Sequence, residues 1–223
     1  MKLYFSPLAC SLAARIALYE ARAEAEYIEV DTETKTTSDG ADYLSIHALG
    51  LVPALRLDSG ELLTENAAVL QHLADRFPDA QLAPTDAAGR SRLQQWLSFI
   101  ATELHKVVYV PLLDKTAPDA AKAYALAKAD VRLGWVASHL EGRETLLDRF
   151  SVADAYLFTI LSWSAVTPIQ LQKWPALAAY TRRILARPHI ARALAEEKDL
   201  YLAELARHAT PLDPQTAAAL RVS

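Results

Sequence analysis

The first 80 residues alternate between strand-like and helix-like spacing of their apolar positions. Residues 3–5 form a short apolar run, and residues 11–23 then place their apolar side chains mostly on one helical face. Residues 26–30 alternate polar and apolar side chains, which is typical of a half-buried strand. Further along, the pattern predicts a loop with a short helix over 31–46, strands over 51–57 and 61–63, and a helix over 64–77. This order predicts a small α/β unit with a mixed sheet.

The strand pattern does not recur after residue 80. Residues 78–86 carry two prolines and no helical period, which indicates a linker. Apolar residues then repeat along a predicted long helix: Leu93, Trp96, Leu97, Ile100, Leu104, Val107 and Val108. Further helices are predicted over 120–140, 151–163, 174–186 and 188–207, and Ser151 and Asp154 have the spacing of a capping box. The sequence therefore predicts an α/β domain over 1–80, a linker over 81–86 and an all-helical domain over 87–223.

A second face of the long helix is polar or small. His105 follows Gln94, Ser98 and Ala101 at spacings of four, three and four residues. Because residues three and four apart are neighbours on a helix, we expect these four side chains to share one face, offset from the apolar stripe.

Composition and charge exclude several classes of function. The chain is 52% hydrophobic and 22% charged, as in an ordinary globular protein, and its net charge of −4, with no basic cluster, gives no reason to expect nucleic acid. No apolar run approaches the roughly 20 residues of a membrane helix. The single cysteine cannot form an internal disulfide, and no Cys/His spacing resembles a zinc site. We expect a cytoplasmic protein without metal or membrane.

The only cysteine, Cys10, stands where the first predicted helix begins. A helix N-terminus presents unpaired N–H groups and a partial positive charge, which favour a thiolate over a thiol. The position therefore suits a reactive sulfur, or a site that holds the sulfur of another molecule. The alternative is a small buried residue, since free cysteines are often buried.

A proline occupies the beginning of the third predicted strand, where it removes a hydrogen bond of the sheet. A cis bond between Val52 and Pro53 would expose the Val52 backbone N–H and C=O to a bound peptide. The alternative is a trans proline on an edge strand, which base rates favour. A thiol at a helix start and a later Val-Pro before a hairpin are more informative together than either is alone.

Four blocks of the sequence keep a common order and spacing: CSLAARIALYEA, GLVPALRLDSGELLTENAAVLQHLADRFPD, WLSFIATELHK and SVADAYLFTIL. Together they resemble the glutathione S-transferases, and in particular the bacterial Beta class, over nearly the whole chain. The resemblance implies a thioredoxin-like first domain, a helical second domain that forms the electrophile pocket, and a homodimer that binds glutathione as co-substrate.

The resemblance also implies catalytic roles for three residues. Cys10 matches the family's catalytic or glutathione-linking cysteine, and Ser11 could donate its hydroxyl to the glutathione sulfur. His105 could hydrogen-bond that sulfur or act as a general acid or base, because the ordinary pKa of histidine lies near neutrality. Without the resemblance, Ser11 is an ordinary helix-start residue, and a lone helical histidine is structural or solvated.

Further residues match positions at which the family binds glutathione. Glu65 can face the α-ammonium group of the γ-glutamyl unit, and the N–H groups of 64–66, with the amide of Asn66, suit its α-carboxylate. Lys35 matches a position that meets the glycine carboxylate. The alternatives are a solvated loop lysine and three residues that merely cap a helix. The implied binding set is Lys35, Leu51, Val52, Pro53, Glu65, Asn66, Ser98 and Lys106.

The sequence departs from the usual Beta pattern around this set. Phe5 stands where tyrosine is common, Asn66 where serine is usual and Ser98 where asparagine is usual, and Ala48, Leu49 and Leu51 replace proline, lysine and glutamine. Each lost polar contact is worth about 0.5–1.5 kcal/mol. We therefore expect weaker glutathione binding than in a typical relative, or a shift toward an apolar ligand.

The predicted function is a glutathione transferase of detoxification that conjugates the glutathione thiol to apolar electrophiles. Glutathione-dependent thiol–disulfide exchange through Cys10 is a second activity that one cysteine permits. The alternative is a non-catalytic ligand-binding or interaction protein on the same fold. Residues from about 203 to 223 are expected either to cover the apolar pocket or to fray.

Overall fold

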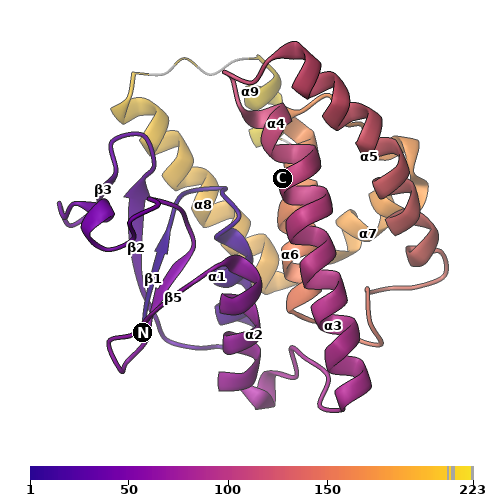
Figure 1. Cartoon of the computed structure of the whole chain (residues 1–223), viewed down its shortest axis with the longest axis horizontal. Helices are drawn as coiled ribbons and strands as arrows, with labels where there is room; N and C mark the ends of the chain where they lie inside the picture. Colours follow the sequence, from indigo (N-terminus) through magenta and orange to yellow (C-terminus); the bar gives the residue numbers. More distant parts are fainter. Residues whose placement is uncertain (210, 212–213, 222–223) are drawn as a thin grey trace. The chain divides into compact units, whose positions relative to one another are not determined.

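The computed structural model describes residues 1–209, 211 and 214–221, and the chain divides into two compact units (Figure 1). The first unit comprises Met1–Ala83 and Pro188–Pro211, and the second comprises Pro84–Arg187 and Leu212–Ser223. The helix Pro188–Arg207 thus groups with the sheet of the first unit, whereas the sequence placed it with the helical domain. The domain boundaries 1–80, 81–86 and 87–223 stay a prediction.

The first unit contains the mixed sheet that the sequence predicts. Its strands lie in the order β3-β2-β1-β4-β5, and β1 pairs parallel with β2 and antiparallel with β4. The two-residue strand β3 is an addition inside the predicted polar loop, where it is too short to show a period of two. The strands are β1 Lys2–Phe5, β2 Glu26–Asp31, β3 Thr36–Thr37, β4 Ala54–Arg56 and β5 Leu62–Thr64.

Three helices accompany this sheet (Figure 1). They are α1 Leu12–Glu20, α2 Asn66–Arg76 and α8 Pro188–Arg207, and the short 3-10 turns η1 Tyr43–Ser45 and η2 Pro78–Ala80 lie in the same unit. Helix α1 packs against both α2 and α8. Every side chain of α1 from Leu12 to Leu18 is buried for this reason, Arg15 included. The packing of α1 therefore fixes the end of the loop that connects β1 to α1.

The second unit is helical, with no strand among its described residues. Helix α6 is buried along almost its whole length, and α7 and η3 pack against it. The predicted capping box at its start is confirmed: the Ser151 N–H donates to Asp154 Oδ2 at 2.9 Å. The elements are α3 Ala87–Phe99, η3 Ile100–Tyr109, α4 Val110–Leu113, α5 Asp119–Leu140, α6 Val152–Ser162, η4 Trp163–Val166, η5 Leu171–Lys173, α7 Pro175–Leu185 and α9 Pro214–Arg221.

The long helix of the second unit changes geometry at Ile100. From there to Tyr109 it is a π-helix, and at its end the Val110 N–H bonds the carbonyl of His105, five residues back. A π-turn holds more residues than an α-turn, so each residue rotates less about the axis. The predicted apolar stripe is still largely buried, but Ser98 is exposed while His105 is buried. The two residues thus differ in burial, and their shared face stays a prediction.

Among the described residues, no helix is both long enough and apolar enough to span a membrane. Of the segment from about 203 to 223, the structure describes 203–209, 211 and 214–221. The other five positions lie outside the described residues.

Candidate functional site

Cys10 lies in the loop between β1 and α1, two residues before the first residue of the helix. Its thiol is partly exposed and donates a hydrogen bond to the Val52 carbonyl, with an Sγ–O distance of 3.2 Å. The bond between Val52 and Pro53 is cis. The two sequence features that were 42 positions apart therefore meet at one point in the first unit.

Ser11 does not have the environment expected of a donor to a bound sulfur. Its side chain is fully buried, and its hydroxyl donates to the Ser6 carbonyl and accepts the Ser6 N–H, both at 3.2 Å. These bonds close the turn over residues 6–11, from which Cys10 projects. The structure thus corrects the expected catalytic role of Ser11 to a local structural one.

Asn66 joins the start of α2 to the cysteine loop. Its amide Nδ2 donates to the Cys10 carbonyl at 2.9 Å, and the residue is buried. Among the described residues, the Asn66 Oδ1 atom has no hydrogen-bond partner, although it is buried. The residue was expected as a helix cap, but the N-cap position belongs to Glu65, and no side chain caps this helix. The helix therefore begins within residues 64–66, as the capping interpretation expects, but without a side-chain cap.

Glu65 is exposed, and its backbone has a φ of +65° and a ψ of +118°. A residue other than glycine in such a conformation costs of order 1–3 kcal/mol, and the surrounding structure must impose it. Here the Glu65 carbonyl accepts the first two hydrogen bonds of α2, from Ala68 and Val69. The conformation leaves the carboxylate free to extend into solvent beside the N-terminus of the helix.

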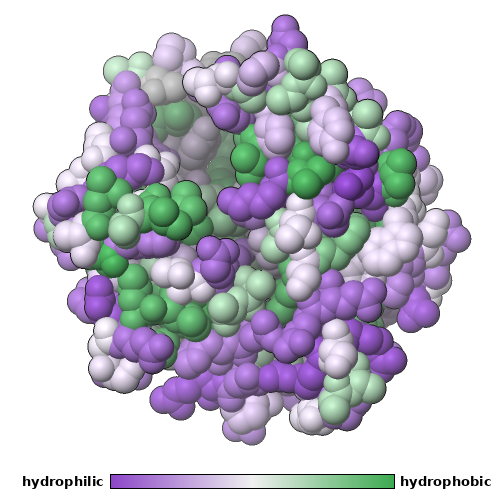
Figure 2. All heavy atoms as spheres, viewed as in Figure 1, coloured by the Kyte–Doolittle hydropathy of each residue, from purple (hydrophilic) through white to green (hydrophobic). Residues whose placement is uncertain are grey.

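Lys35 lies beside the loop that contains Leu51, and aliphatic side chains are exposed around it. The Lys35 ammonium donates to the Gly50 carbonyl at 3.1 Å, and its Cδ would lie 3.0 Å from a Cβ at Gly50. Leu49 and Leu51 are 69% and 47% exposed. Figure 2 shows groups of hydrophobic residues among the hydrophilic ones on the face in view. The rim of this loop is apolar, as the substitutions in the sequence suggest.

His105 lies in the second unit, on η3, and only 8% of it is exposed. Its Nδ1 is 2.8 Å from the Tyr156 hydroxyl, and its ring packs edge-on against Trp163 with centroids 5.1 Å apart. Burial, and then the charge of Lys106, lower the pKa of His105 to about 4. The expectation of titration near neutrality is wrong, and at pH 7 this side chain is a neutral donor and acceptor.

The structure thus brings part of the expected set together by direct contact. Cys10, Val52 and Asn66 are joined by hydrogen bonds, with Pro53 and Glu65 as their chain neighbours. Ser98 and Lys106 are exposed and belong, with His105, to the second unit.

Two charged residues of the first unit were not anticipated. Glu197 of α8 is fully buried, accepts the Leu8 N–H at 2.8 Å and pairs with Arg15 Nε at 3.0 Å. Burial raises the pKa of Glu197, and the Arg15 charge opposes this. The Arg15 guanidinium lies between the rings of Phe5 and Tyr27, 4.3 and 4.4 Å from their centroids. The sequence held one sign of this pair: Arg15 lies on the apolar face of a predicted helix, where a buried charge needs a partner.

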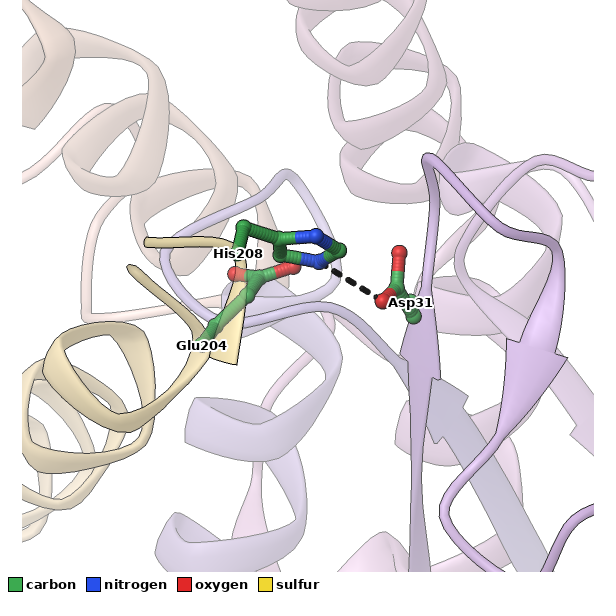
Figure 3. A group of neighbouring side chains, drawn as sticks. All are labelled: Asp31, Glu204 and His208. Atoms are coloured by element: carbon green, nitrogen blue, oxygen red, sulfur yellow. Dashed lines mark ion pairs between the residues drawn. The ribbon is translucent and has the colours of Figure 1, made fainter. Parts of the chain in front are cut away.

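Another group of titratable side chains ties the end of α8 to the end of β2 (Figure 3). His208 Nε2 lies 2.7 Å from Asp31 Oδ2, and donor atoms of Asp31, Glu204 and His208 all lie within 4.8 Å of one another. Asp31 Oδ1 accepts the N–H groups of Glu33 and Thr34. Carboxylate and imidazole groups can also serve as metal donors, and here the imidazole of His208 contacts the Asp31 carboxylate directly.

Comparisons with known proteins agree over most of the chain. The family model described as "Glutathione S-transferase, N-terminal domain" matches residues 9–76, and "Glutathione S-transferase, C-terminal domain" matches residues 99–188. The chain is 40% identical to the glutathione S-transferase GstA of Escherichia coli O157:H7 over 88% of this chain and 98% of that protein. It is 35% identical to the glutathione S-transferase GST-4.5 of Xanthomonas campestris pv. campestris over the same shares.

Solved structures give the same result. The ternary complex of BphK, a bacterial GST, is 46% identical with a TM-score of 0.86, over 88% of this chain and 99% of that one. A sphingomonad glutathione S-transferase complexed with glutathione is 44% identical with a TM-score of 0.84, over 88% of this chain and 98% of that one.

Proposed function

We propose that glutathione binds in the first unit of this chain with its sulfur beside Cys10. The chain belongs to the glutathione S-transferase family and is a glutathione transferase. The observation that carries this proposal is the meeting of Cys10, the Val52 carbonyl and the start of α2 at one point. The backbone of a peptide bound along Val52 can donate to the Val52 carbonyl, and the charged ends of the peptide can bind charged groups on either side.

The charges of glutathione match the residues around this point. The N-terminus of α2 offers unpaired N–H groups to the γ-glutamyl carboxylate, and the exposed Glu65 carboxylate suits the α-ammonium group. Lys35, whose ammonium lies at the Gly50 carbonyl, is a partner for the glycine carboxylate. One cation, one anion and one helix terminus therefore complement the two carboxylates and one ammonium of the tripeptide.

Conjugation needs a thiolate and a carbon that can lose a leaving group. The glutathione sulfur forms a bond to the electrophilic carbon, the leaving group departs with the electron pair of the broken bond, and the thiol proton passes to solvent. Burial lowers the pKa of His105 to about 4, so at pH 7 this side chain is neutral and cannot act as an imidazolium acid. The electrophile is apolar, in keeping with the exposed leucines at the rim of the Lys35 loop.

Cys10 also supports glutathione-dependent thiol–disulfide exchange. Its thiolate attacks a disulfide between glutathione and a substrate thiol, which forms a mixed disulfide with glutathione and releases the substrate thiolate. The thiolate of a second glutathione then attacks this mixed disulfide, releasing oxidised glutathione and the Cys10 thiolate. The homodimer, the detoxification role and the cytoplasmic location belong to the same proposal, and the non-catalytic alternative is not favoured by the comparisons.

Calorimetric titration with glutathione, together with turnover of 1-chloro-2,4-dinitrobenzene, tests the proposal. Lys35→Met should weaken binding by about tenfold or more, the effect of losing one hydrogen bond to a charged group. Lys128→Met is the matched control, because this lysine lies over the Tyr124 ring in the second unit. Cys10→Ala should abolish disulfide exchange. The absence of binding heat and of any shift in melting temperature at saturating glutathione would refute the proposal.

A further inference from the structure

Three side chains with metal-binding donor atoms point toward one another where the end of helix α8 meets the end of strand β2 (Figure 3). Asp31 is the last residue of β2, Glu204 lies in the last turn of α8, and His208 directly follows that helix. The His208 N–H donates to the Glu204 carbonyl at 3.1 Å, so the helical geometry continues to this residue. Residues four apart lie on one helical face, which presents the carboxylate and the imidazole side by side. Within the described part of the chain, this is the one such group of three donors.

The Asp31 carboxylate is held in one orientation by the loop that follows it. Its Oδ1 accepts the N–H groups of Glu33 and Thr34 at 2.9 and 3.0 Å, while its Oδ2 lies next to His208. Carboxylates that bind metals are themselves hydrogen-bonded in this way, because such bonds orient the ligand before the ion arrives. The end of β2 therefore supplies a preorganised oxygen donor.

The His208 imidazole has a ring nitrogen that no hydrogen bond satisfies. Nε2 is buried and lies 2.7 Å from Asp31 Oδ2, yet it has no hydrogen-bond partner among the residues that the structure describes. At so short a distance only an unfavourable angle prevents the bond, so an N–H on Nε2 would not point at the oxygen. Nδ1 lies 3.7 Å from the exposed Glu33 carboxylate, an acceptor for the proton of the other tautomer. In that tautomer Nε2 offers a lone pair beside the Asp31 oxygen, and a cation bound to both atoms would remove their repulsion.

The surroundings of Glu204 also favour a bound cation. Burial, and then the charges of Glu29 and Asp31, raise the pKa of Glu204, while Arg207 and His208 act in the opposite direction. Its carboxylate forms no hydrogen bond or ion pair with another described residue, and the neighbouring Arg207 is engaged in an ion pair with Glu29. A divalent ion would compensate the carboxylates of Asp31 and Glu204 together.

We propose that Asp31, Glu204 and His208 form a structural zinc site that joins the end of α8 to the end of β2. One imidazole nitrogen and two carboxylate oxygens are donors that Zn²⁺ accepts, with water in the fourth, tetrahedral position. The imidazole argues against Mg²⁺ and Ca²⁺, which take oxygen ligands, and a group without a thiolate argues against Cu⁺. The sequence predicted no metal, because only the fold brings these donors together. None of the three residues belongs to the set proposed for glutathione, so the inference does not rest on the proposed function.

Calorimetric titration of the full chain with zinc chloride, without a histidine tag, tests the proposal. We expect one zinc ion per chain and a higher melting temperature with zinc, because an ion that binds only the folded state stabilises it. Asp31→Asn, Glu204→Gln and His208→Gln should each weaken zinc binding by about tenfold or more, since even groups that only hydrogen-bond a ligand contribute about 10–100-fold to metal affinity. Glu204→His exchanges one donor for another and should retain binding, which a purely electrostatic role of Glu204 would not allow. His189→Gln is the matched control, because it removes an imidazole from the other end of α8, outside the group.

Co²⁺ gives a second readout, because a tetrahedral Co²⁺ ion absorbs visible light far more strongly than an octahedral one. We expect strong absorption with the wild type and with His189→Gln, and weak absorption with His208→Gln. Zinc binding that the three donor variants retain, or that needs millimolar zinc, would show an adventitious ion only and overturn the inference. Equal affinity for Mg²⁺ or Ca²⁺ would overturn it as well. A chain that binds zinc in this way but turns over no electrophile would support the zinc site and refute only the proposed function.

Discussion

Replacing Glu197 by leucine would remove one partner of a buried ion pair while leaving the other in place. Glu197 is fully buried, and the side chain of Arg15 is 5% exposed. In the variant, Arg15 would keep one ion pair, with Glu196 at 3.3 Å, beside its contacts with aromatic side chains, and the Leu8 N–H would lose the Glu197 acceptor. Breaking a buried pair on one side costs about 3–5 kcal/mol, because an uncompensated charge remains. The free energy of unfolding should fall by that amount.

Thermal unfolding followed by calorimetry measures this loss. In a chain of this size each kcal/mol shifts the melting temperature by about 2–4 °C, so we expect a fall of roughly 6–20 °C. Glu196→Leu is the control on the same helix, since its carboxylate is 38% exposed, it pairs with the exposed Arg192, and Glu197 still compensates the charge of Arg15 in that variant. That variant should cost at most about 1 kcal/mol.

A double variant separates the charge from the packing. Arg15→Met with Glu197→Leu replaces the pair by apolar side chains, an exchange that is often neutral or stabilising in proteins. We expect it to recover most of the stability that Glu197→Leu loses. If Glu197→Leu costs less than Glu196→Leu, or if the double variant is less stable than the single one, the ion-pair reasoning is refuted.

Three further predictions concern other residues. The pKa of His105 falls from 6.5 to about 4 on folding, so its contribution to stability is complete above pH 6.5 and is lost as pH falls through 4. Thermal scans should show that the free energy of unfolding decreases by about 3 kcal/mol over this range, and His105→Asn should remove this pH dependence. Asp154→Asn should cost about 1–3 kcal/mol in urea unfolding, because Asp154 accepts bonds from Leu146, Ser151 and Tyr180, and an unchanged midpoint would contradict this. Leu51→Gln should tighten glutathione binding by about two- to tenfold in calorimetry, and weaker binding would count against the apolar-rim argument.

The elements with a clear apolar period could be predicted from the sequence. The helices expected over 120–140 and 188–207 are found as Asp119–Leu140 and Pro188–Arg207, and the capping box at Ser151 is confirmed. The π-helix over Ile100–Tyr109 could not be predicted, because its wider turns are a matter of backbone hydrogen bonding, which the spacing of apolar residues does not report.

The residues of the candidate site that lie in recognisable motifs could be predicted from the sequence. The contacts that these residues make with distant segments could not. The resemblance to the family led us to expect Cys10 and Val52 in one binding site, and the two residues are hydrogen-bonded. The burial of His105 could not be foreseen, because Tyr156 and Trp163 reach it from another helix. Ser11 was misjudged because a buried hydroxyl beside a turn bonds the nearest backbone groups first. The contact between Leu8 and Glu197 joins residues 189 positions apart, which no local pattern indicates.

The hydrogen bond from Cys10 to Val52 has its own consequence for the reactivity of the thiol. A thiol donates to a carbonyl, whereas a thiolate 3.2 Å from the same oxygen would be repelled by its partial negative charge. In the free protein the thiol is therefore engaged with the Val52 carbonyl, and this hydrogen bond must break before the sulfur can react.

A bound tripeptide that donates its own N–H to Val52 would take this acceptor away from Cys10. S-methylglutathione, which has no thiol of its own, should then accelerate alkylation of Cys10 by iodoacetamide at pH 7, as long as its methyl group leaves the sulfur accessible. Mass spectrometry of the Cys10 peptide gives the rate, and a mixture of γ-glutamate and glycine is the control for charge alone. If S-methylglutathione binds by calorimetry but leaves the alkylation rate unchanged while a small alkylating agent still reaches the thiol, the Val52 carbonyl does not restrain Cys10.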